Sequence, residues 1–533
     1  MWHSWNLYRY FHGRQLVLAI NLAAGLSIFF FGYDQGVMSG VNISPDYIQV
    51  MGLSGKDALL GGVVAVYYAG TCAGALMGGY IGDKIGRIRT VVVGSLIAIL
   101  GAVLQTTAQD VAWMMASRII TGIGTGHLNA IVPVWSAETS HHTSRGMFIA
   151  MEFTLNIFGL VVAYWIDYAM SFTGGALRWR FPIAFQLVPL LFLAIGINFF
   201  PESPRWLCQV GREQEAIDIL SSLRGDGDPA HPEVQKEYNQ VMEAIELEAK
   251  EGEPSYFSML FKKDSLNIPR RVHLSIWLQI LQELTGIGVI TVYAPSVFSS
   301  AGFSGSTSQL LSGLNNIYYM LCTLVPVFTL DKFGRRFTLF YGAVLQGICM
   351  LLIGVLTKPS IMSMNPLAYG VAATVFTFGY TGFFGMTWLA VPWLYPVEIY
   401  PTKVRAKGGA WSVVGWSIGN AFIMEITPPM LSGIGWITFI ILAALNFLTI
   451  PIVWAFYPET SNKTLEEMDA VFATKSSLVF KAEKELAKIR ERHDGSLALS
   501  DTGSRRSYCY DPGDEKKSTT TSFHSPATYH TKA

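Results

Sequence analysis

Asp83-Lys-Ile-Gly-Arg87 follows an apolar run in the first half of this chain, and Asp331-Lys-Phe-Gly-Arg-Arg336 follows another in the second half. Two more motifs recur in the same order in both halves: Glu138 and Arg145 match Glu398 and Arg405, and Pro201-Glu-Ser matches Pro458-Glu-Thr. Three motif pairs at similar separations indicate an internal duplication. In membrane proteins, parallel repeats of this kind are typical of transporters that rock two halves about a site near the bilayer midplane.

Long apolar runs lie between these motifs. Of the 533 residues, 51% are hydrophobic and only 14% are charged, whereas an average soluble domain carries about a quarter charged residues. An apolar run of ~20 residues can cross a bilayer. We therefore predict an all-α membrane protein with twelve spans in two halves of six, at about 15–40, 59–81, 90–108, 112–134, 147–168, 182–200, 272–298, 310–330, 337–357, 367–395, 409–430 and 434–457.

The predicted spans divide the chain into five parts. The segment between the halves is rich in Glu, Lys and Arg with helical periodicity, as expected of a soluble linker. The last segment becomes rich in Ser and Thr, and its composition predicts disorder from about residue 495. The parts are a cytoplasmic N-terminus (1–14), a six-helix bundle (15–200), a cytoplasmic linker (201–271), a second six-helix bundle (272–457) and a cytoplasmic C-terminal tail (458–533).

Arg and Lys concentrate in alternate connectors between the spans. By the positive-inside rule, these connectors and both termini are cytoplasmic, which requires an even number of spans and agrees with twelve. The pair Arg178 and Arg180 is an exception on the opposite side. We expect a multi-pass protein of the plasma membrane, embedded in the lipid bilayer.

Nothing in the sequence indicates a cofactor. The five cysteines stand singly, without the spacing of a metal or redox site, and a formal net charge of zero suggests no nucleic-acid partner. Gly122-x-Gly-x-Gly126 lies in an apolar helix with no strand before it, so helix packing is favoured over nucleotide binding. Gly70, Gly74, Gly78 and Gly82 recur every four residues and predict a smooth packing face. No nucleophile triad or metal cluster indicates an enzyme.

The charged motifs of both halves lie where helices are expected to leave the membrane on the cytoplasmic side. We predict that they form inter-helix ion pairs that hold one access state. The alternative is that they only anchor the topology. The predicted cytoplasmic gate joins Asp83 and Arg87 to Glu138 and Arg145, and Asp331, Arg335 and Arg336 to Glu398 and Arg405.

Two ionisable residues fall within apolar runs of the first half. Asp34 ends the first run, and Arg118 opens Arg118-Ile-Ile-Thr-Gly122 in the fourth span. Charges at membrane depth are costly and are usually paired or functional. If these two pair, protonation of Asp34 releases Arg118 and couples proton arrival to helix movement. The alternative places Asp34 among the headgroups and leaves Arg118 to anchor a helix end.

Polar residues also interrupt the seventh span. Gln279, Gln282 and Glu283 lie at i, i+3 and i+4 on one helix face, and Tyr293 follows them. Several hydrogen-bond donors and acceptors in an apolar wall suit a polyhydroxylated ligand, and the alternative is a polar clamp between helices. Two residues of later spans are candidates for a stacking surface and an amide at the same site: Trp393 and Asn420.

From about Gly25 to Asp469 the chain resembles the sugar porter family of the major facilitator superfamily. The motifs that carry the resemblance are Gly32-Tyr-Asp34, Gly82 to Arg87, Arg118 with Thr121-Gly122, Glu138 with Arg145-Gly146, Pro201-Glu-Ser-Pro-Arg-Trp-Leu207, Gln282 to Pro295, Asp331 to Arg336, Pro392-Trp393, Glu398 to Gly408, and Pro458-Glu-Thr with Thr464-Leu-Glu-Glu467. The resemblance implies the family fold, alternating access and hexose-type substrates. It also implies that Asp34 and Arg118 pair, as in proton-coupled members. The segment around Ile399 and the long tail resemble the fungal branch.

The sequence departs from the family pattern at several sugar-binding positions. Phe153 stands where the fifth-helix Gln is expected, with Glu152 beside it, and Glu283 replaces the second Gln of the seventh helix. Tyr319 replaces the eighth-helix Asn, although Asn315 lies one turn away. Glu152 and Asn315 therefore join the candidate binding residues. Three family-like residues remain: Gln282, Trp393 and Asn420.

We predict transmembrane transport of a neutral hexose or pentose by alternating access, coupled to protons, in a chain that functions as a monomer. Carboxylates at Glu152 and Glu283 would repel an anionic ligand, which favours a neutral solute over a sugar acid. The alternatives are a polyol or sugar-acid permease and a transporter-like nutrient sensor. The complete motif pairs favour transport over sensing.

Overall fold

The computed structural model describes residues 7–139, 145–251, 255–262, 266–362, 366–401, 404–461, 463, 465–474, 478–482 and 484. Within these ranges the secondary structure is helical and contains no strand. One compact unit comprises Met1–Ala482. The segment from about 495, for which disorder is predicted, lies outside the described residues.

The first half contains six spans, and the sixth consists of two helices. α7 ends at Phe185 because Pro189 lacks the N–H that would bond the Phe185 carbonyl. A glycine at φ +98°, Gly86, separates the second span from the third. The helices are α1 (Gly13–Val41), the short α2 (Pro45–Val50), α3 (Asp57–Ile85), α4 (Arg87–Thr106), α5 (Val111–Thr139), α6 (Arg145–Met170), α7 (Leu177–Phe185) and α8 (Leu187–Gly196).

The second half also contains six spans, three of which are broken. In the seventh span the break falls at Gly286, whose φ of +99° is a left-handed conformation that other residues rarely adopt. The eighth and tenth spans break just before Pro326 and Pro392. The helices are α13 (Ile268–Leu284), α14 (Ile287–Val292), α15 (Ala294–Ser300), α16 (Gly305–Cys322), α17 (Pro326–Phe333), α18 (Arg335–Met362), α19 (Pro366–Met386), α20 (Val391–Ile399), α21 (Arg405–Gly433) and α22 (Ile437–Phe456).

Each of the twelve predicted spans coincides with one helix or with consecutive helices. Within the described ranges, nine helical segments are long and apolar enough to cross a membrane. The other three predicted spans are α5, α13 to α15, and α21, which carry Arg118, Glu283 and Asn420.

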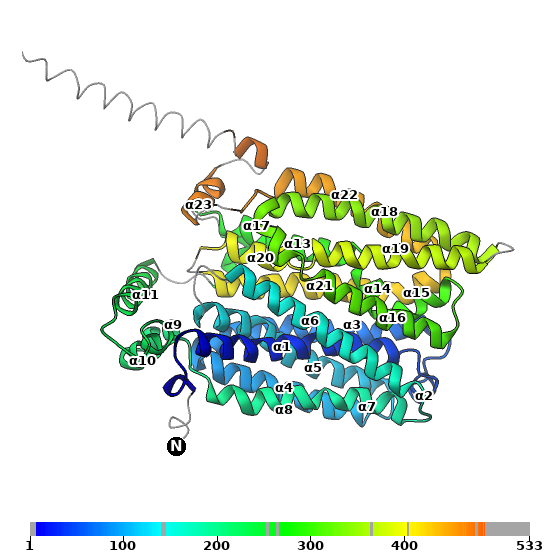
Figure 1. The fold of residues 1–533 in the computed structure, drawn as a ribbon, viewed down its shortest axis with the longest axis horizontal. Coiled ribbons are helices and arrows are strands. Elements are labelled where there is room, and N and C mark those ends of the chain that lie inside the picture. The colour runs from blue at the N-terminus through cyan, green and yellow to red at the C-terminus, as the bar shows by residue number, and fades with distance from the viewer. Residues whose placement is uncertain are drawn as a thin grey trace, which may run out of the picture. The chain divides into compact units, whose positions relative to one another are not determined.

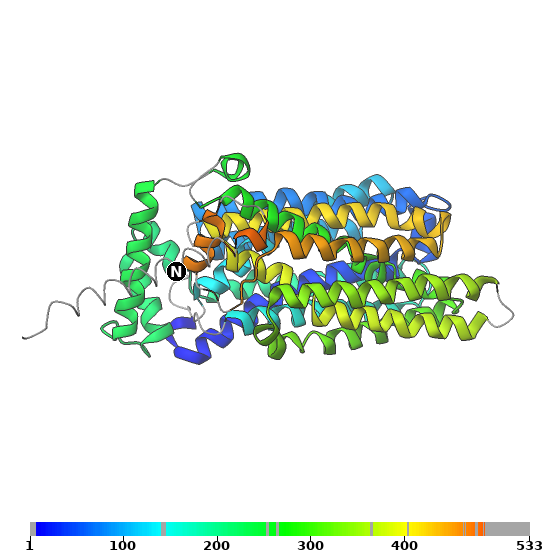
Figure 2. The same cartoon turned by 90° about the horizontal axis from the view of Figure 1, so that it is seen from above.

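The two halves lie side by side in Figure 1, with α1 to α8 in blue to cyan and α13 to α22 in green to orange. Across the boundary α3 packs against α21, and α6 packs against α16. α2 lies at one end of the long helices. The helices between the halves lie at the opposite end, which we call the linker end (Figures 1 and 2).

The linker itself is helical, as predicted. Arg224 connects two of the linker helices, because its Nε donates to Glu237 at 2.8 Å. It also connects the linker to the first half, because its Nη2 donates to the carbonyl of Thr139, at the end of α5, at 3.4 Å. The helices at this end are α9 (Pro204–Gln209), α10 (Glu213–Arg224), α11 (Pro232–Glu251), α12 (Tyr256–Phe261) and, after the second half, α23 (Leu465–Ala473).

α3 and α5 touch backbone to backbone along their glycines. A Cβ atom added to Gly74 would lie 2.2 Å from the carbonyl oxygen of Ile123, and one added to Gly122 would lie 2.1 Å from that of Tyr67. Both distances are shorter than a non-bonded contact between a carbon and an oxygen atom can be. The glycines therefore serve close helix packing, as the sequence predicted.

Replacing Gly74 with Ala should lower the free energy of unfolding by about 1–3 kcal/mol, because the added methyl group forces α3 and α5 apart. Thermal unfolding of the purified protein measures this change. Gly409→Ala is the matched control, since no heavy atom lies within 4 Å of the added Cβ and Ala favours a helix. A Gly74→Ala variant as stable as wild type would show that the close approach is not needed.

Candidate functional site

A cavity of about 60 Å³ lies between the two halves. Seven of its lining residues belong to the first half and thirteen to the second. One buried water molecule needs roughly 10–15 Å³ of cavity volume. The cavity therefore has room for a few groups of the size of a water molecule. A site between two halves becomes accessible from either end when the halves rock. Its polar lining residues are Gln35, Asn156, Gln282, Glu283, Thr291 and Asn420.

The broken seventh span supplies two of these polar side chains. α13 ends at Leu284, and Gly286 redirects the backbone before α14. Gln282 Nε2 donates a hydrogen bond to the carbonyl of Trp388 at 2.7 Å, whereas the buried Oε1 has no partner among the described residues. The amide of Gln282 is thus held in place with its acceptor oxygen left for a ligand.

Glu283 lies beside Gln282 and is only 4% exposed. Its Cβ lies 3.0 Å from the position of a Cβ added to Gly419, so α13 and α21 approach closely here. Asn420 and Trp416 of α21 line the cavity together with Glu283. Two predicted site residues, Glu283 and Asn420, therefore lie together in the cavity wall.

Aromatic rings form another part of the cavity wall. The ring centroid of Trp393 lies 6.0 Å from that of Trp416 and 5.6 Å from that of Phe153. Trp416 meets Phe31 at 5.1 Å and Tyr68 at 5.3 Å, both edge to face. Because these rings come from both halves, the aromatic contacts join the halves at the cavity. Phe153 fills the position where an amide is expected from the family pattern.

Four predicted site residues do not line this cavity. Each contacts a neighbouring helix instead: Gln279 Nε2 donates to the carbonyl of Pro392 (3.2 Å), the Tyr293 hydroxyl donates to the carbonyl of Met424 (3.0 Å), Asn315 Oδ1 accepts from the Thr381 hydroxyl (2.9 Å), and Glu152 Oε1 accepts from the Ser136 hydroxyl (2.9 Å). For Gln279 this contact matches the alternative of a polar clamp between helices.

The lining residues that the sequence predictions do not name include Gln35, Asn156 and Trp416. Gln35 directly follows Asp34, and Asn156 is an isolated amide within the apolar run of α6. A lone polar side chain in a predicted span is a signal that could have identified both. Trp416 lies one helical turn before Asn420, on the same face of α21.

Asp34 and Arg118 form an ion pair inside the first half. Arg118 Nη1 lies 3.3 Å from Asp34 Oδ1, and the two side chains are 2% and 0% exposed. The guanidinium also lies over the ring of Tyr67, 4.5 Å from its centroid. The pairing that the sequence analysis considers is therefore formed. A role in proton coupling stays a prediction, and the neighbouring Gln35 places the pair one residue from the cavity lining.

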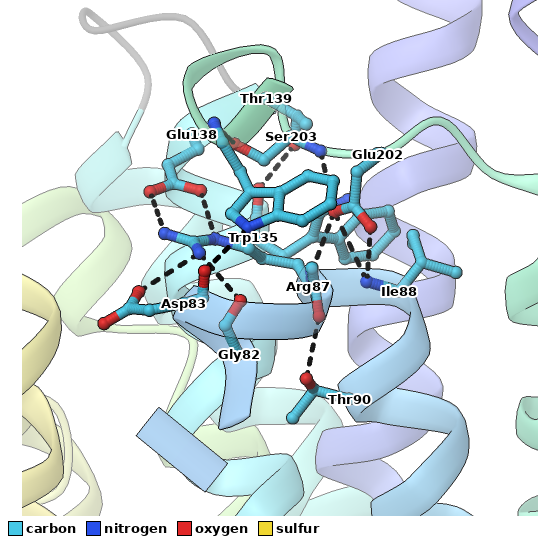
Figure 3. Close-up of polar contacts among 12 residues, drawn as sticks. Gly82, Asp83, Arg87, Ile88, Thr90, Trp135, Glu138, Thr139, Glu202 and Ser203 are labelled. Atoms are coloured by element: carbon cyan, nitrogen blue, oxygen red, sulfur yellow. Dashed lines mark hydrogen bonds and ion pairs between the residues drawn. The ribbon is translucent and has the colours of Figure 1, made fainter. Parts of the chain in front are cut away.

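At the linker end of the first half, Arg87 is the centre of a polar network (Figure 3). Its Nε and Nη2 donate to the two carboxylate oxygens of Glu138 at 3.0 and 3.1 Å, which makes a bidentate pair. Its Nη1 donates to Asp83 at 3.2 Å and to the carbonyl of Gly82 at 3.0 Å. Three of the predicted gate residues, Asp83, Arg87 and Glu138, thus meet.

Glu202, in the motif that closes the first half, adds a helix cap to this network (Figure 3). Its carboxylate accepts the backbone N–H groups of Arg87 at 2.9 Å and Ile88 at 3.2 Å. These N–H groups open α4 and have no partner within the helix, and a negative charge is favourable at that end. Burial raises the pKa of Glu202, and the backbone N–H groups of Ser203, Arg87 and Ile88 oppose this shift.

The second half repeats the arrangement. Arg335 Nη2 donates to Glu398 Oε1 at 2.6 Å, and the Thr460 hydroxyl donates to Glu398 Oε2 at 2.6 Å. Glu459 accepts the backbone N–H groups of Arg335 at 2.8 Å and Arg336 at 3.0 Å, at the start of α18. Each half therefore has its own arginine–glutamate pair and its own helix cap from the closing motif.

Two other predicted gate residues have side chains that donate to backbone carbonyls, and the side chains of two more lie outside the description. The side chain of Arg336 donates to the carbonyl of Trp454 and not to a predicted acidic partner. Its backbone N–H donates to Glu459, which caps α18. Arg405 Nη2 donates to the carbonyl of Tyr400 at 3.4 Å. The side chains of Arg145 and Asp331 are not among those that the structure describes.

A metal site is not formed by the described part of the chain. Within those ranges, no group of three or more His, Cys, Asp or Glu side chains is placed to hold an ion. The described cysteines, Cys72, Cys208, Cys322 and Cys349, are free thiols, and three of them are buried.

Known proteins similar to this chain are transporters. The profile of the family described as sugar (and other) transporter matches residues 20–472. The chain is 36% identical to the MFS-type transporter oryC of Aspergillus oryzae, over 88% of this chain and 87% of the relative. It is 32% identical to the sugar transporter STL1 of Saccharomyces cerevisiae, over 86% and 82%. Among solved structures, it is similar to the proton:xylose symporter XylE bound to 6-bromo-6-deoxy-D-glucose, with a TM-score of 0.73, 26% identity, and coverage of 86% of this chain and 100% of that chain.

Proposed function

We propose that this chain, which belongs to the sugar transporter family, moves a monosaccharide across the membrane by alternating access. The monosaccharide is a hexose or a pentose. Members of this family are transporters, so the chain is a multi-pass membrane transporter and not an enzyme. The observation that carries the proposal is the cavity between the halves, where the amides of Gln282 and Asn420 meet the indole of Trp393. Amides suit sugar hydroxyls, and an indole suits the apolar face of a sugar ring.

We propose that sugar movement is coupled to protons through Asp34 and Arg118. Two observations support this: the pair is buried beside the cavity lining, and a similar solved structure is that of a proton:xylose symporter. A carboxylate paired with an arginine favours its charged form, so a proton must compete with the ion pair. Ligand binding that weakens the pair then favours protonation, and protonation favours ligand binding.

We also propose that the linker end faces the cytoplasm of a cell whose plasma membrane holds the protein. The basic connectors support this orientation. Under it, the networks around Arg87 and Arg335 stabilise the helix ends of each half at the cytoplasmic exit. Residues of both halves of a single chain line the cavity, which supports function as a monomer.

Uptake by cells that lack their own hexose carriers tests the proposed function. Full-length protein should accumulate a labelled hexose or pentose above its external concentration, and a protonophore should abolish that accumulation. Uptake of a polyol or a sugar acid alone would overturn the monosaccharide assignment. Uptake that only equilibrates would overturn symport. A nutrient-dependent signal without any uptake would indicate a sensor.

Gln282→Ala should weaken sugar binding about fivefold, because it removes a hydrogen bond worth about 1 kcal/mol. Trp393→Ala should weaken it by a similar factor through the loss of an aromatic contact. The apparent affinity of uptake measures both effects. Gln346→Ala is the control, since that amide donates to Thr387 at 3.2 Å and does not line the cavity. Unchanged affinity in both test variants would move the site elsewhere.

A further inference from the structure

The cavity lining contains a carboxyl group without a basic partner. Glu283 is the acidic residue of its lining, and no Lys, Arg or His occurs among the described residues that line it. Arg118 of the first half is already paired with Asp34. A buried carboxylate is costly unless it is paired or hydrogen-bonded. Asn420 and Trp416 line the cavity with Glu283, and neither brings a positive charge.

The side chains around Glu283 suit a cation. Trp416 and Trp393 line the cavity with Glu283, and the ring centroids of the two tryptophans lie 6.0 Å apart. Phe31 and Tyr68 complete the aromatic wall around Trp416. The faces of Trp, Tyr and Phe rings attract an ammonium group within about 6 Å. A carboxylate set among such rings combines the two groups that bind ammonium.

A neutral sugar does not account for this arrangement. Amides such as Gln282, Asn420 and Asn156 can donate to and accept from hydroxyl groups without a net charge. A sugar acid would bring a second negative charge close to Glu283. An amine-bearing solute, in contrast, neutralises the carboxylate and stacks against the indoles.

We propose that this cavity recognises a protonated amine on a polyhydroxylated solute, with the ammonium group paired to Glu283 and lying against Trp393 and Trp416. The inference rests on the proposed sugar transport and names the substrate class that the site prefers. The amides of Gln282 and Asn420 then hold the hydroxyl groups of the same solute.

Binding of matched probes to the purified full-length protein tests this preference. The probes are D-glucose, 2-amino-2-deoxy-D-glucose, 6-amino-6-deoxy-D-glucose and N-acetyl-D-glucosamine, which carries nitrogen without charge. At least one amine should bind about tenfold more tightly than glucose and N-acetylglucosamine, as expected for one charge-assisted contact. Glu283→Gln should remove that advantage. Glu283→Asp, which keeps the charge, should retain a preference for the amine, and melting curves of both variants check their folding.

Glu425→Gln is the matched control, because Glu425 lies on α21, is exposed and does not line the cavity. It should bind all four probes as wild type does. Glucose bound as tightly as both amines by the wild-type protein would overturn the inference and leave sugar transport standing. An amine preference that survives Glu283→Gln would overturn the assignment to this carboxylate. Binding of none of the probes would overturn the inference, and uptake of labelled hexoses and pentoses would then decide the proposed function separately.

Discussion

Replacing Asp34 with Asn should abolish uphill accumulation of substrate while leaving exchange across the membrane measurable. The amide cannot take up or release a proton, so ligand binding can no longer be linked to protonation. The Asp34–Arg118 pair is fully buried, with 3.3 Å between Oδ1 and Nη1. Proteoliposomes with an imposed pH gradient measure accumulation, and counterflow without a gradient measures exchange. The concentration ratio should fall from well above one to one.

Two further variants isolate the effect of proton exchange. Asp57→Asn changes a carboxyl group at the start of α3 that does not line the cavity, and it should accumulate substrate normally. Asp34→Glu keeps a titratable group and should restore some accumulation. Because an uncompensated Arg118 costs about 3–5 kcal/mol, a misfolded Asn variant would lose counterflow as well.

Accumulation by Asp34→Asn would show that Asp34 is not the coupling site. The next candidate is then Glu152, a buried carboxyl group of α6 that accepts a hydrogen bond from Ser136. A wild-type protein without any pH-dependent uptake would be a facilitator, in which the pair of Asp34 and Arg118 is structural.

Arg335→Ala and Glu398→Ala should each reduce stability by about 1.5–3 kcal/mol and lower the transport rate, because either change removes a charge-assisted contact from a largely buried pair. The 2.6 Å contact between them lies at the linker end of the second half. The double variant should be less damaged than the sum of the single changes, since the two residues act on one interaction. Melting temperature and turnover in proteoliposomes measure both effects.

Arg336→Ala is the matched control for this pair. Arg336 is the next residue in the chain, but its side chain contacts the carbonyl of Trp454, and its contribution to the Glu459 cap comes from the backbone. It should melt and transport nearly as wild type does. Strictly additive losses in the double variant, or normal turnover in Arg335→Ala, would contradict a role for the pair in holding an access state.

The fold was predictable because its main determinants are local. Apolar runs of spanning length and the recurrence of Asp83 to Arg87 as Asp331 to Arg336 are visible without any knowledge of tertiary contacts. The breaks within the spans were harder to predict from the sequence. The bend at Gly286 depends on a left-handed backbone that a glycine permits but does not require.

The site was only partly predictable, because helical spacing identifies a face without saying where that face points. Gln279, Gln282 and Glu283 share a face, yet Gln279 bonds the carbonyl of Pro392 and only the other two line the cavity. The rotation of each helix is set by packing across the two halves. Asn315 likewise contacts Thr381 on a neighbouring helix, a contact that no spacing rule indicates.

The contacts described above at the linker end each join residues of the same half of the chain. In the first half, Trp135 Nε1 also donates to the carbonyl of Pro201 at 3.0 Å, and Trp206 Nε1 donates to that of Asp83 at 2.9 Å. All the groups in these contacts leave the ribosome before the second half is synthesised. The amino-terminal bundle can therefore close its network during translation, and a defect in Arg87 should already impair membrane insertion of a nascent chain that ends at the linker.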